Sequence, residues 1–139
     1  MVKLPADILK FMDIFTGNGY AIYVVGGAVR NLLLGKEVIN WDFTTNAKPE
    51  ELKNLFPDSF YNNTFGTVGV KFEKHILEVT THRKESDYSD ARHPDIIEWA
   101  DSIEDDLARR DFTINAVALH YVNDKPVLTD PYNGQKHLK

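Results

Sequence analysis

Hydrophobic residues near the start of the chain recur at the three- and four-residue spacing of an amphipathic helix. Between residues 5 and 16 this spacing is followed by Ile8, Leu9, Met12 and Phe15. Gly17 and Gly19 then interrupt the pattern. We therefore predict a helix over residues 5–16 with one side packed on the core.

A continuous run of β-favouring residues follows and stops at two glycines. Residues 20–25 form the run, and Gly26 and Gly27 end it. Residues 28–34 return to a helical pattern, which Gly35 terminates. The order strand, glycine turn, helix is therefore predicted here.

The middle of the chain is rich in valine, phenylalanine and threonine, which favour strands. Residues 41–45 predict a short strand, and residues 49–56 predict a helix with a proline in its first turn. Residues 66–74 and 76–81 predict two strands joined by a turn near Lys74 and His75.

The last third of the chain is more polar. We expect a mobile loop over the charged residues 83–94. Helices are predicted over residues 102–109 and 113–119, and residues 120–121 and 127–128 are expected to pair across a turn at 123–124. The histidines lack the spacing of metal ligands, so loop or surface positions are expected for His75, His82, His93, His120 and His137. Packing in the core or at its rim is expected for Trp41 and Trp99.

Length and composition narrow the class of protein. The 139 residues, 42% of them hydrophobic, fit one domain with one core. The sequence contains neither an apolar run long enough to span a membrane nor a secretory leader, so we expect a cytoplasmic protein. Without cysteine, a metal site must use carboxylates, amides or histidines. The net charge of −5 argues against a surface that only coats nucleic acid, although an enzyme that brings magnesium to phosphate needs acidic residues at its centre.

The glycine pair is the first candidate for chemistry. Gly26 and Gly27 free backbone N–H groups, and without Cβ atoms they let a phosphate approach closely. Arg30 could add a guanidinium to the same phosphate. The alternative is a simple tight turn with a solvated arginine.

Oxygen-bearing side chains form the second candidate. Asn40 and Asp42 flank Trp41, and alternate residues of a strand point to the same side, as the oxygen ligands of magnesium require. If the strand carrying Glu78 lies beside them, Glu78 completes a cluster for one or two metals. Alternatively, Asn40 and Asp42 cap a loop, and Glu78 is an ordinary outward-facing residue.

A third candidate is the segment of residues 109–116. Arg109 and Arg110 precede a predicted helix, where cations are unfavourable unless an anion offsets them. A triphosphate would offset them. A salt bridge to Glu104, Asp105 or Asp106 is the alternative.

These motifs, in their order and spacing, resemble the class II CCA-adding and poly(A)-adding enzymes of the DNA polymerase β superfamily. The first motif of that family resembles GGAVRNLLLGKEVINWDFTT, and its third carboxylate lies in a stretch similar to LEVTTHR. The loop and the second motif resemble DYSDARHPD and EDDLARRDFTINAVA, and the segment closing the head resembles DPYNG. The resemblance implies an α/β (α+β) head domain over residues 1–139, with a small mixed sheet, flanking helices, and a metal site on edge strands beside the glycine turn.

The resemblance also implies roles for residues. Phosphates of the incoming nucleotide would be contacted by Gly26, Gly27, Arg30 and Arg110, while Asp111 and its neighbours, Asn115 included, would help select a ribonucleotide. Asp42, Glu78 and Asn40 would hold Mg²⁺, or Mn²⁺. The implied reaction is attack of a tRNA or other RNA 3′-hydroxyl on the α-phosphate of CTP or ATP, with two metals stabilising the entering and leaving oxygens.

The sequence departs from the family's pattern in three ways. Asn31 and Asn40 stand where the family has aspartate, and Asn40 removes one negative charge from the metal site. The neck, body and tail that follow the head in the family, together with the base-selecting motif, are not among these residues. A weakened nucleotidyltransferase is therefore expected, with a catalytically inactive nucleotide- or RNA-binding homologue or fragment as the alternative. The RRDFTINA run of residues 109–116 disfavours a third possibility, an enzyme that modifies small molecules.

Overall fold

The computed structural model of the protein is built around a mixed sheet. It describes residues 4–38, 40–62, 67–73, 75–84, 98–99, 102–108, 117–122 and 125–130. Within these residues, seven strands are hydrogen-bonded in the order β3-β4-β5-β2-β1-β8-β9, and β6 pairs separately with β7. The sheet is mixed because β2 pairs in parallel with β5 and antiparallel with β1.

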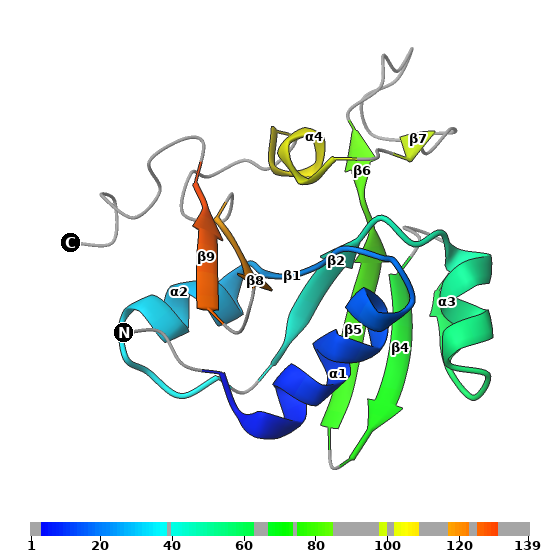
Figure 1. Ribbon diagram of the computed structural model, residues 1–139, viewed down its shortest axis with the longest axis horizontal. Coiled ribbons are helices and arrows are strands. Elements are labelled where there is room, and N and C mark those ends of the chain that lie inside the picture. The colour runs from blue at the N-terminus through cyan, green and yellow to red at the C-terminus, as the bar shows by residue number, and fades with distance from the viewer. Residues whose placement is uncertain are drawn as a thin grey trace.

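Helices and strands alternate in the first part of the chain, and strands predominate after residue 55 (Figure 1). The helices are α1 (Ala6–Gly17), α2 (Gly27–Leu33), α3 (Pro49–Leu55) and α4 (Ile103–Ala108). The strands of the first half are β1 (Ile22–Val25), β2 (Asp42–Thr45), β3 (Phe60–Asn62), β4 (Thr67–Phe72) and β5 (His75–Thr81). The remaining strands are β6 (Arg83–Lys84), β7 (Glu98–Trp99), β8 (Ala118–Val122) and β9 (Lys125–Thr129).

One face of the sheet carries the main core, which α1 covers. Of the predicted apolar stripe of α1, Ile8, Met12 and Phe15 are buried and Leu9 is partly buried. Phe11, outside that prediction, is also buried, with its ring centroid 5.1 Å from that of Phe43 and 5.3 Å from that of Phe72. The helices α2 and α3 add Val29 and Leu52 to the same core. Figure 1 shows α1 crossing in front of the central strands. Burial of these large side chains, each worth about 1.5–3 kcal/mol, holds the layers together.

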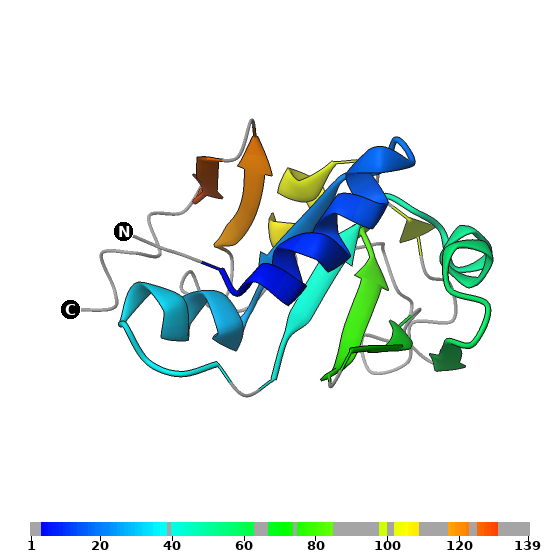
Figure 2. The same ribbon diagram turned by 60° about the horizontal axis from the view of Figure 1, so that its bottom comes forward.

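The opposite face is covered in part by α4. Ile103 and Leu107 of this helix pack against Val25 of β1 and Ala118 of β8, forming a second, smaller core cluster. Val24 belongs to the main core and Val25 to this second one, as the alternation of a strand requires. Turning the view brings α1 to the front of the sheet with α4 behind it (Figure 2).

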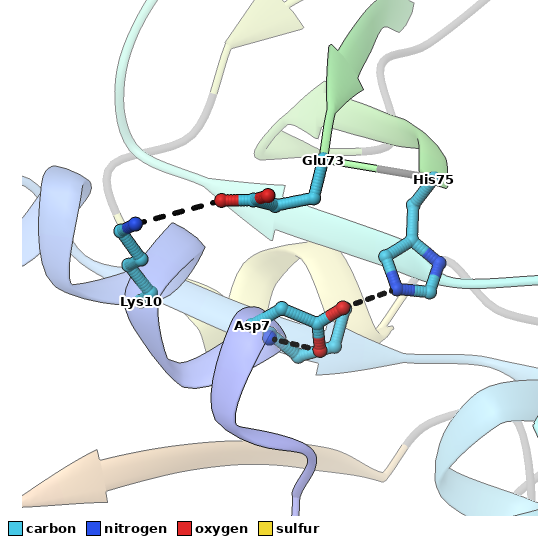
Figure 3. A network of polar contacts seen from close by, with 5 residues as sticks. Asp7, Lys10, Glu73 and His75 are labelled. Carbon is cyan, nitrogen blue, oxygen red and sulfur yellow. Dashed lines mark hydrogen bonds and ion pairs between the residues drawn. The ribbon is translucent and has the colours of Figure 1, made fainter.

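Polar contacts attach α1 to the turn between β4 and β5 (Figure 3). Nε2 of His75 lies 2.6 Å from Oδ2 of Asp7, and Nζ of Lys10 lies 3.5 Å from Oε1 of Glu73. The hydrogen bond from His75 lowers the pKa of Asp7 below its ordinary value. We call these four residues, Asp7, Lys10, Glu73 and His75, the α1 clasp. Their contacts hold the first turn of α1 against the β4–β5 hairpin.

Most predicted elements are confirmed within one or two residues. The predicted helices over 5–16, 28–34, 49–56 and 102–109 correspond to α1–α4, and the strands over 20–25, 41–45, 66–74 and 76–81 to β1, β2, β4 and β5. The pairing of residues 120–121 with 127–128 is also confirmed, because His120 faces Val127 in the β8–β9 register. Burial of Trp41 in the core is confirmed, whereas the side chain of Trp99 lies outside the described residues.

Three expectations about the elements and the histidines are wrong. The helix predicted over 113–119 does not extend to its end, because Ala118 and Leu119 belong to β8; residues 113–116 lie outside the described part. Residues 83–84, expected in a loop, form β6, and residues 85–94 lie outside the described part.

The third error concerns histidine. His82 was expected in a loop or at the surface; it lies between β5 and β6 but is only 1% exposed, and its ring has a hydrogen-bond partner in Thr44. His75 and His120 lie on strands, partly buried, rather than in loops, and His93 and His137 lie outside the described residues. Among the described helices, none is long and apolar enough to cross a membrane.

Candidate active site

Two of the predicted acidic side chains lie side by side on the sheet. The strands β2 and β5 are parallel neighbours, and Asp42 is the register partner of Glu78. Register partners on adjacent strands point to the same face, with backbones about 4.8 Å apart. Leu77 and Val79 are buried in the main core while Glu78 is exposed, so the two acids occupy the face opposite α1.

The strands that carry these acids are not at the edge of the sheet, contrary to expectation. In the strand order, β5 lies between β4 and β2, and β2 lies between β5 and β1. The β3–β4 and β8–β9 pairs extend the sheet on both sides of them. The acids therefore reach the surface from the face of an interior part of the sheet.

Asn40 lies just before the strand that carries Asp42. It is exposed and occupies a bend, and Trp41 between them is 5% exposed in the core. The side chains of residues 40 and 42 thus lie outside the core on either side of an anchored tryptophan. Within the described ranges no group of three or more histidine, aspartate or glutamate side chains could hold a metal ion. What the chain offers here is two carboxylates and one amide, oxygen donors that suit Mg²⁺ or Mn²⁺.

The glycine turn borders these acids. Gly26 ends β1 with φ +69° and ψ −143°, a conformation that residues with a side chain rarely adopt. A Cβ at Gly26 would lie 3.8 Å from Oδ2 of Asp42, and one at Gly27 would lie 3.3 Å from Nη2 of Arg30. The structure therefore brings Gly26, Gly27, Arg30 and Asp42 together. The open backbone of the two glycines, with a carboxylate next to one and a guanidinium next to the other, offers groups for both a cation and a phosphate.

One departure from the family's pattern has a local structural role. Nδ2 of Asn31 donates a hydrogen bond to the carbonyl oxygen of Glu37 at 3.1 Å. The amide therefore ties α2 to the chain that follows it. A carboxylate in the same place would have no N–H to donate.

A buried polar pair that the sequence did not reveal lies next to the acids. Thr44, two residues after Asp42 on the same face, is buried, and its Oγ1 lies 2.7 Å from Nδ1 of His82. The Tyr23 ring lies 5.8 Å from the His82 ring and 4.7 Å from the His120 ring. Burial raises the pKa of Tyr23, with a further contribution from Glu104, and burial lowers the pKa of His120. His82 belongs to the LEVTTHR stretch, but nothing in the sequence indicates that its ring is buried.

The remaining predicted residues, Arg110, Asp111 and Asn115, lie outside the described part of the chain. The helix α4, which ends one residue before Arg109, packs against Val25. Val25 is the register partner of Asp42 on β1. The helix α4, which precedes this segment in the chain, therefore lies next to Asp42.

Comparisons with known proteins agree on one family. The family model described as "Poly A polymerase head domain" matches residues 22–139. A CCA-adding enzyme of Geobacillus kaustophilus is 42% identical over 123 residues, which cover 88% of this chain and 30% of that enzyme.

Solved structures give the same result. The Bacillus stearothermophilus CCA-adding enzyme in complex with CTP superposes with a TM-score of 0.78 at 34% identity, over 95% of this chain and 31% of that one. A tRNA nucleotidyltransferase complexed with a primer tRNA and an incoming ATP analog superposes with a TM-score of 0.68 at 35% identity, over 91% of this chain and 35% of that one. The chain thus spans about a third of the length of the relatives it matches.

Proposed function

This chain belongs to the family of the poly(A) polymerase head domain, and from that membership we propose that it is the catalytic head of a template-independent RNA nucleotidyltransferase. The enzyme adds nucleotides, CCA or A, to the 3′ ends of tRNA or other RNA. The observation that carries the proposal is the pairing of Asp42 with Glu78 beside the glycine turn. CTP, an ATP analog and primer tRNA are bound by its structural relatives, and we extend the same substrates to this chain.

Different residues of the chain bind different parts of the nucleotide. Gly26 and Gly27 offer backbone N–H groups to the triphosphate, and Arg30, whose guanidinium lies against Gly27, neutralises part of its charge. Arg110 adds a second guanidinium, and Asp111 and Asn115 select the ribonucleotide; these three assignments rest on the family's motif. The RNA 3′-hydroxyl attacks the α-phosphate, and pyrophosphate leaves.

Asp42 and Glu78 would hold a divalent cation, Mg²⁺ or Mn²⁺, with the amide oxygen of Asn40 as a further ligand. Divalent ions held by these residues would supply Lewis-acid chemistry, lowering the pKa of the 3′-hydroxyl and offsetting the charge on the leaving oxygen. Two carboxylates facing each other repel, and a cation between them removes that repulsion. The donor set therefore fits the ion.

Asn40 weakens the site. An amide oxygen coordinates magnesium but brings no formal charge, so the site binds the metal less tightly. Loss of one main electrostatic group commonly costs about 3–4 kcal/mol in the transition state, or roughly a 100- to 1000-fold lower rate. We therefore expect slow nucleotide addition by the chain as it stands.

An extension assay tests the proposal. The chain and an Asn40→Asp variant are incubated with labelled tRNA lacking its CCA end, each NTP in turn, and Mg²⁺ or Mn²⁺. We expect clear extension by the variant and faint extension by the unmodified chain. An Asp42→Asn change in the Asn40→Asp variant should abolish extension, which guards against a contaminating enzyme.

Asn40 is also the observation that favours a second candidate, a nucleotide- or RNA-binding homologue without activity. Absence of extension by both versions, with nucleotide binding retained, would support this candidate. Because the chain matches only about a third of its relatives, the Asn40→Asp change should also be tested in any longer form of the protein. Failure there would refute the catalytic proposal.

A further inference from the structure

An aromatic ring lies in the same register row as the two acids. The row runs from Asp42 on β2 to Glu78 on β5, Gly69 on β4 and Phe60 on β3, each residue being the register partner of the next. Register partners on neighbouring strands face the same side of the sheet. Phe60 and Glu78 therefore share one face, separated only by Gly69.

The ring of Phe60 lies over Gly69. A Cβ built on Gly69 would collide with Cε2 and Cζ of Phe60, so the ring occupies the space where a side chain would stand. Phe60 is nevertheless 59% exposed. One side of the ring thus rests on the strand backbone and the other is open to solvent, one strand spacing of about 4.8 Å from the column of Glu78.

A cation and a second apolar side chain flank the ring. Lys71 lies two residues beyond Gly69 on β4, and Ile76 lies two residues before Glu78 on β5, so both belong to the same face. Lys71 is exposed and Ile76 is 66% exposed. We call Phe60, Gly69, Lys71 and Ile76 the sheet platform.

We propose that the sheet platform binds the terminal nucleotides of the RNA acceptor strand, with a base stacked on Phe60 and a phosphate against Lys71. This inference rests on the proposed function, because it assigns a docking surface to that function's acceptor. An aromatic ring with one open side, combined with a lysine, suits single-stranded nucleic acid, which offers bases and phosphates together.

The order of groups across the sheet indicates that the sheet platform binds RNA rather than the incoming nucleotide. The glycine turn lies on the β1 side of Asp42, with Gly26 next to Oδ2 of that acid. The platform lies on the other side, beyond Glu78. Because the triphosphate occupies the turn and the reaction joins it to RNA at the acids, the acceptor must arrive from the opposite side, where Phe60 lies.

Direct binding tests the role of the ring. A short 5′-labelled single-stranded RNA is titrated with the chain, without NTP, and binding is followed by fluorescence anisotropy. Phe60→Leu keeps an apolar cover over Gly69 but has no aromatic ring, and it should raise the Kd for RNA at least about fivefold, the lower end of the effect of base–aromatic stacking. Phe60→Trp, which keeps an aromatic ring, should bind RNA with about the affinity of the unmodified chain. Val127→Ala, at an exposed apolar position on β9, is the matched control and should change nothing.

ATP binding by the same variants separates the two kinds of nucleotide. Phe60→Leu should leave ATP affinity unchanged. A fall in ATP affinity with RNA affinity unaltered would assign the ring to the incoming base and overturn the proposal. Absence of RNA binding by the unmodified chain would overturn it as well.

Salt dependence tests the phosphate contact. Lys71→Ala should reduce the slope of log Kd against log salt by about 0.7, the value for one phosphate contact on a single strand. Lys125→Ala, at another exposed lysine on β9, is the control. Equal slopes for both variants and the unmodified chain would show that Lys71 does not contact an RNA phosphate.

Failure of the platform can be distinguished from failure of the proposed function. If the Asn40→Asp chain extends RNA while Phe60→Leu alters neither RNA affinity nor the KM for RNA, the platform is wrong and the catalytic proposal stands. If no version extends RNA, a longer form with Asn40→Asp included, while Phe60→Leu still weakens RNA binding, the catalytic proposal is wrong and the platform stands.

Discussion

Replacing Glu78 by glutamine should stabilise the metal-free protein and make it less responsive to metal. Asp42 and Glu78 are register partners, and the strands that carry them lie about 4.8 Å apart. Glu78 is exposed, so a water-like dielectric applies, and two unit charges at about 5 Å would repel by about 0.8 kcal/mol. Glutamine removes this repulsion while keeping the shape of the side chain.

A divalent cation acts in the opposite direction. A free metal concentration about 100 times the Kd stabilises the folded state by about 2.7 kcal/mol. For 139 residues the entropy of unfolding is about 0.3 kcal/mol/K, so saturating metal should raise Tm by about 9 °C, and removal of the repulsion by about 3 °C. In EDTA the Glu78→Gln variant should therefore melt above the unmodified chain, and with Mn²⁺ below it.

Thermal melts in EDTA and in Mn²⁺ measure both effects. Glu50→Gln, at an exposed position on α3, is the matched control and should show the metal response of the unmodified chain. Asn40→Asp should show the reverse of Glu78→Gln, with a lower Tm in EDTA and a larger rise with metal. An unchanged metal response in Glu78→Gln would refute the idea that this acid and Asp42 share an ion.

Two further predictions concern the glycine turn and the α1 clasp. Gly26→Ala places a side chain at φ +69°, which should cost about 1–3 kcal/mol and lower Tm by about 3–10 °C, together with nucleotide affinity. Gly17→Ala, where a Cβ would meet no atom within 4 Å, should not lower Tm. Asp7→Asn should lower Tm near neutral pH, because a carboxyl with a lowered pKa in the folded state contributes its full stability above the unfolded-state pKa of about 4 and loses it as pH falls through the folded-state pKa. The difference from the unmodified chain should disappear as acid titration protonates Asp7 in the folded state, and a constant difference down to low pH would contradict this explanation.

The elements that the sequence predicted well are those whose local pattern agrees with their tertiary environment. The stripe of α1 is buried against Phe43, and β1 ends at the glycine turn because Gly26 adopts a positive φ. The short strand β3 left no comparable signal. Its hydrophobic residue Phe60 is exposed rather than buried, so β3 has no alternation of buried and exposed positions that the sequence could reveal. The pairing with β4 is what makes β3 a strand.

The errors have a common physical cause, which is that long-range pairing overrides local preference. Ala118 and Leu119 continue a helix-compatible pattern, yet β8 forms because Leu119 pairs with Val24 of β1 and with Leu128 of β9. His82 is buried because Thr44, 38 positions earlier, supplies its hydrogen bond. The interior position of β2 likewise depends on strands distant in sequence.

The position of Glu78 is determined by residues that take no part in chemistry. A shift of β5 by one residue relative to β2 would turn every side chain of β5 to the other face, placing Glu78 in the core and Val79 in solvent. Burial of Leu77 and Val79 opposes that shift by about 1.5–3 kcal/mol for each side chain. The same register that buries these residues places Glu78 opposite Asp42 on β2 and opposite Gly69 on β4. The sheet therefore positions the acids and the Phe60 ring together, and a substitution in the core that disturbs β5 should impair metal binding and RNA binding in parallel.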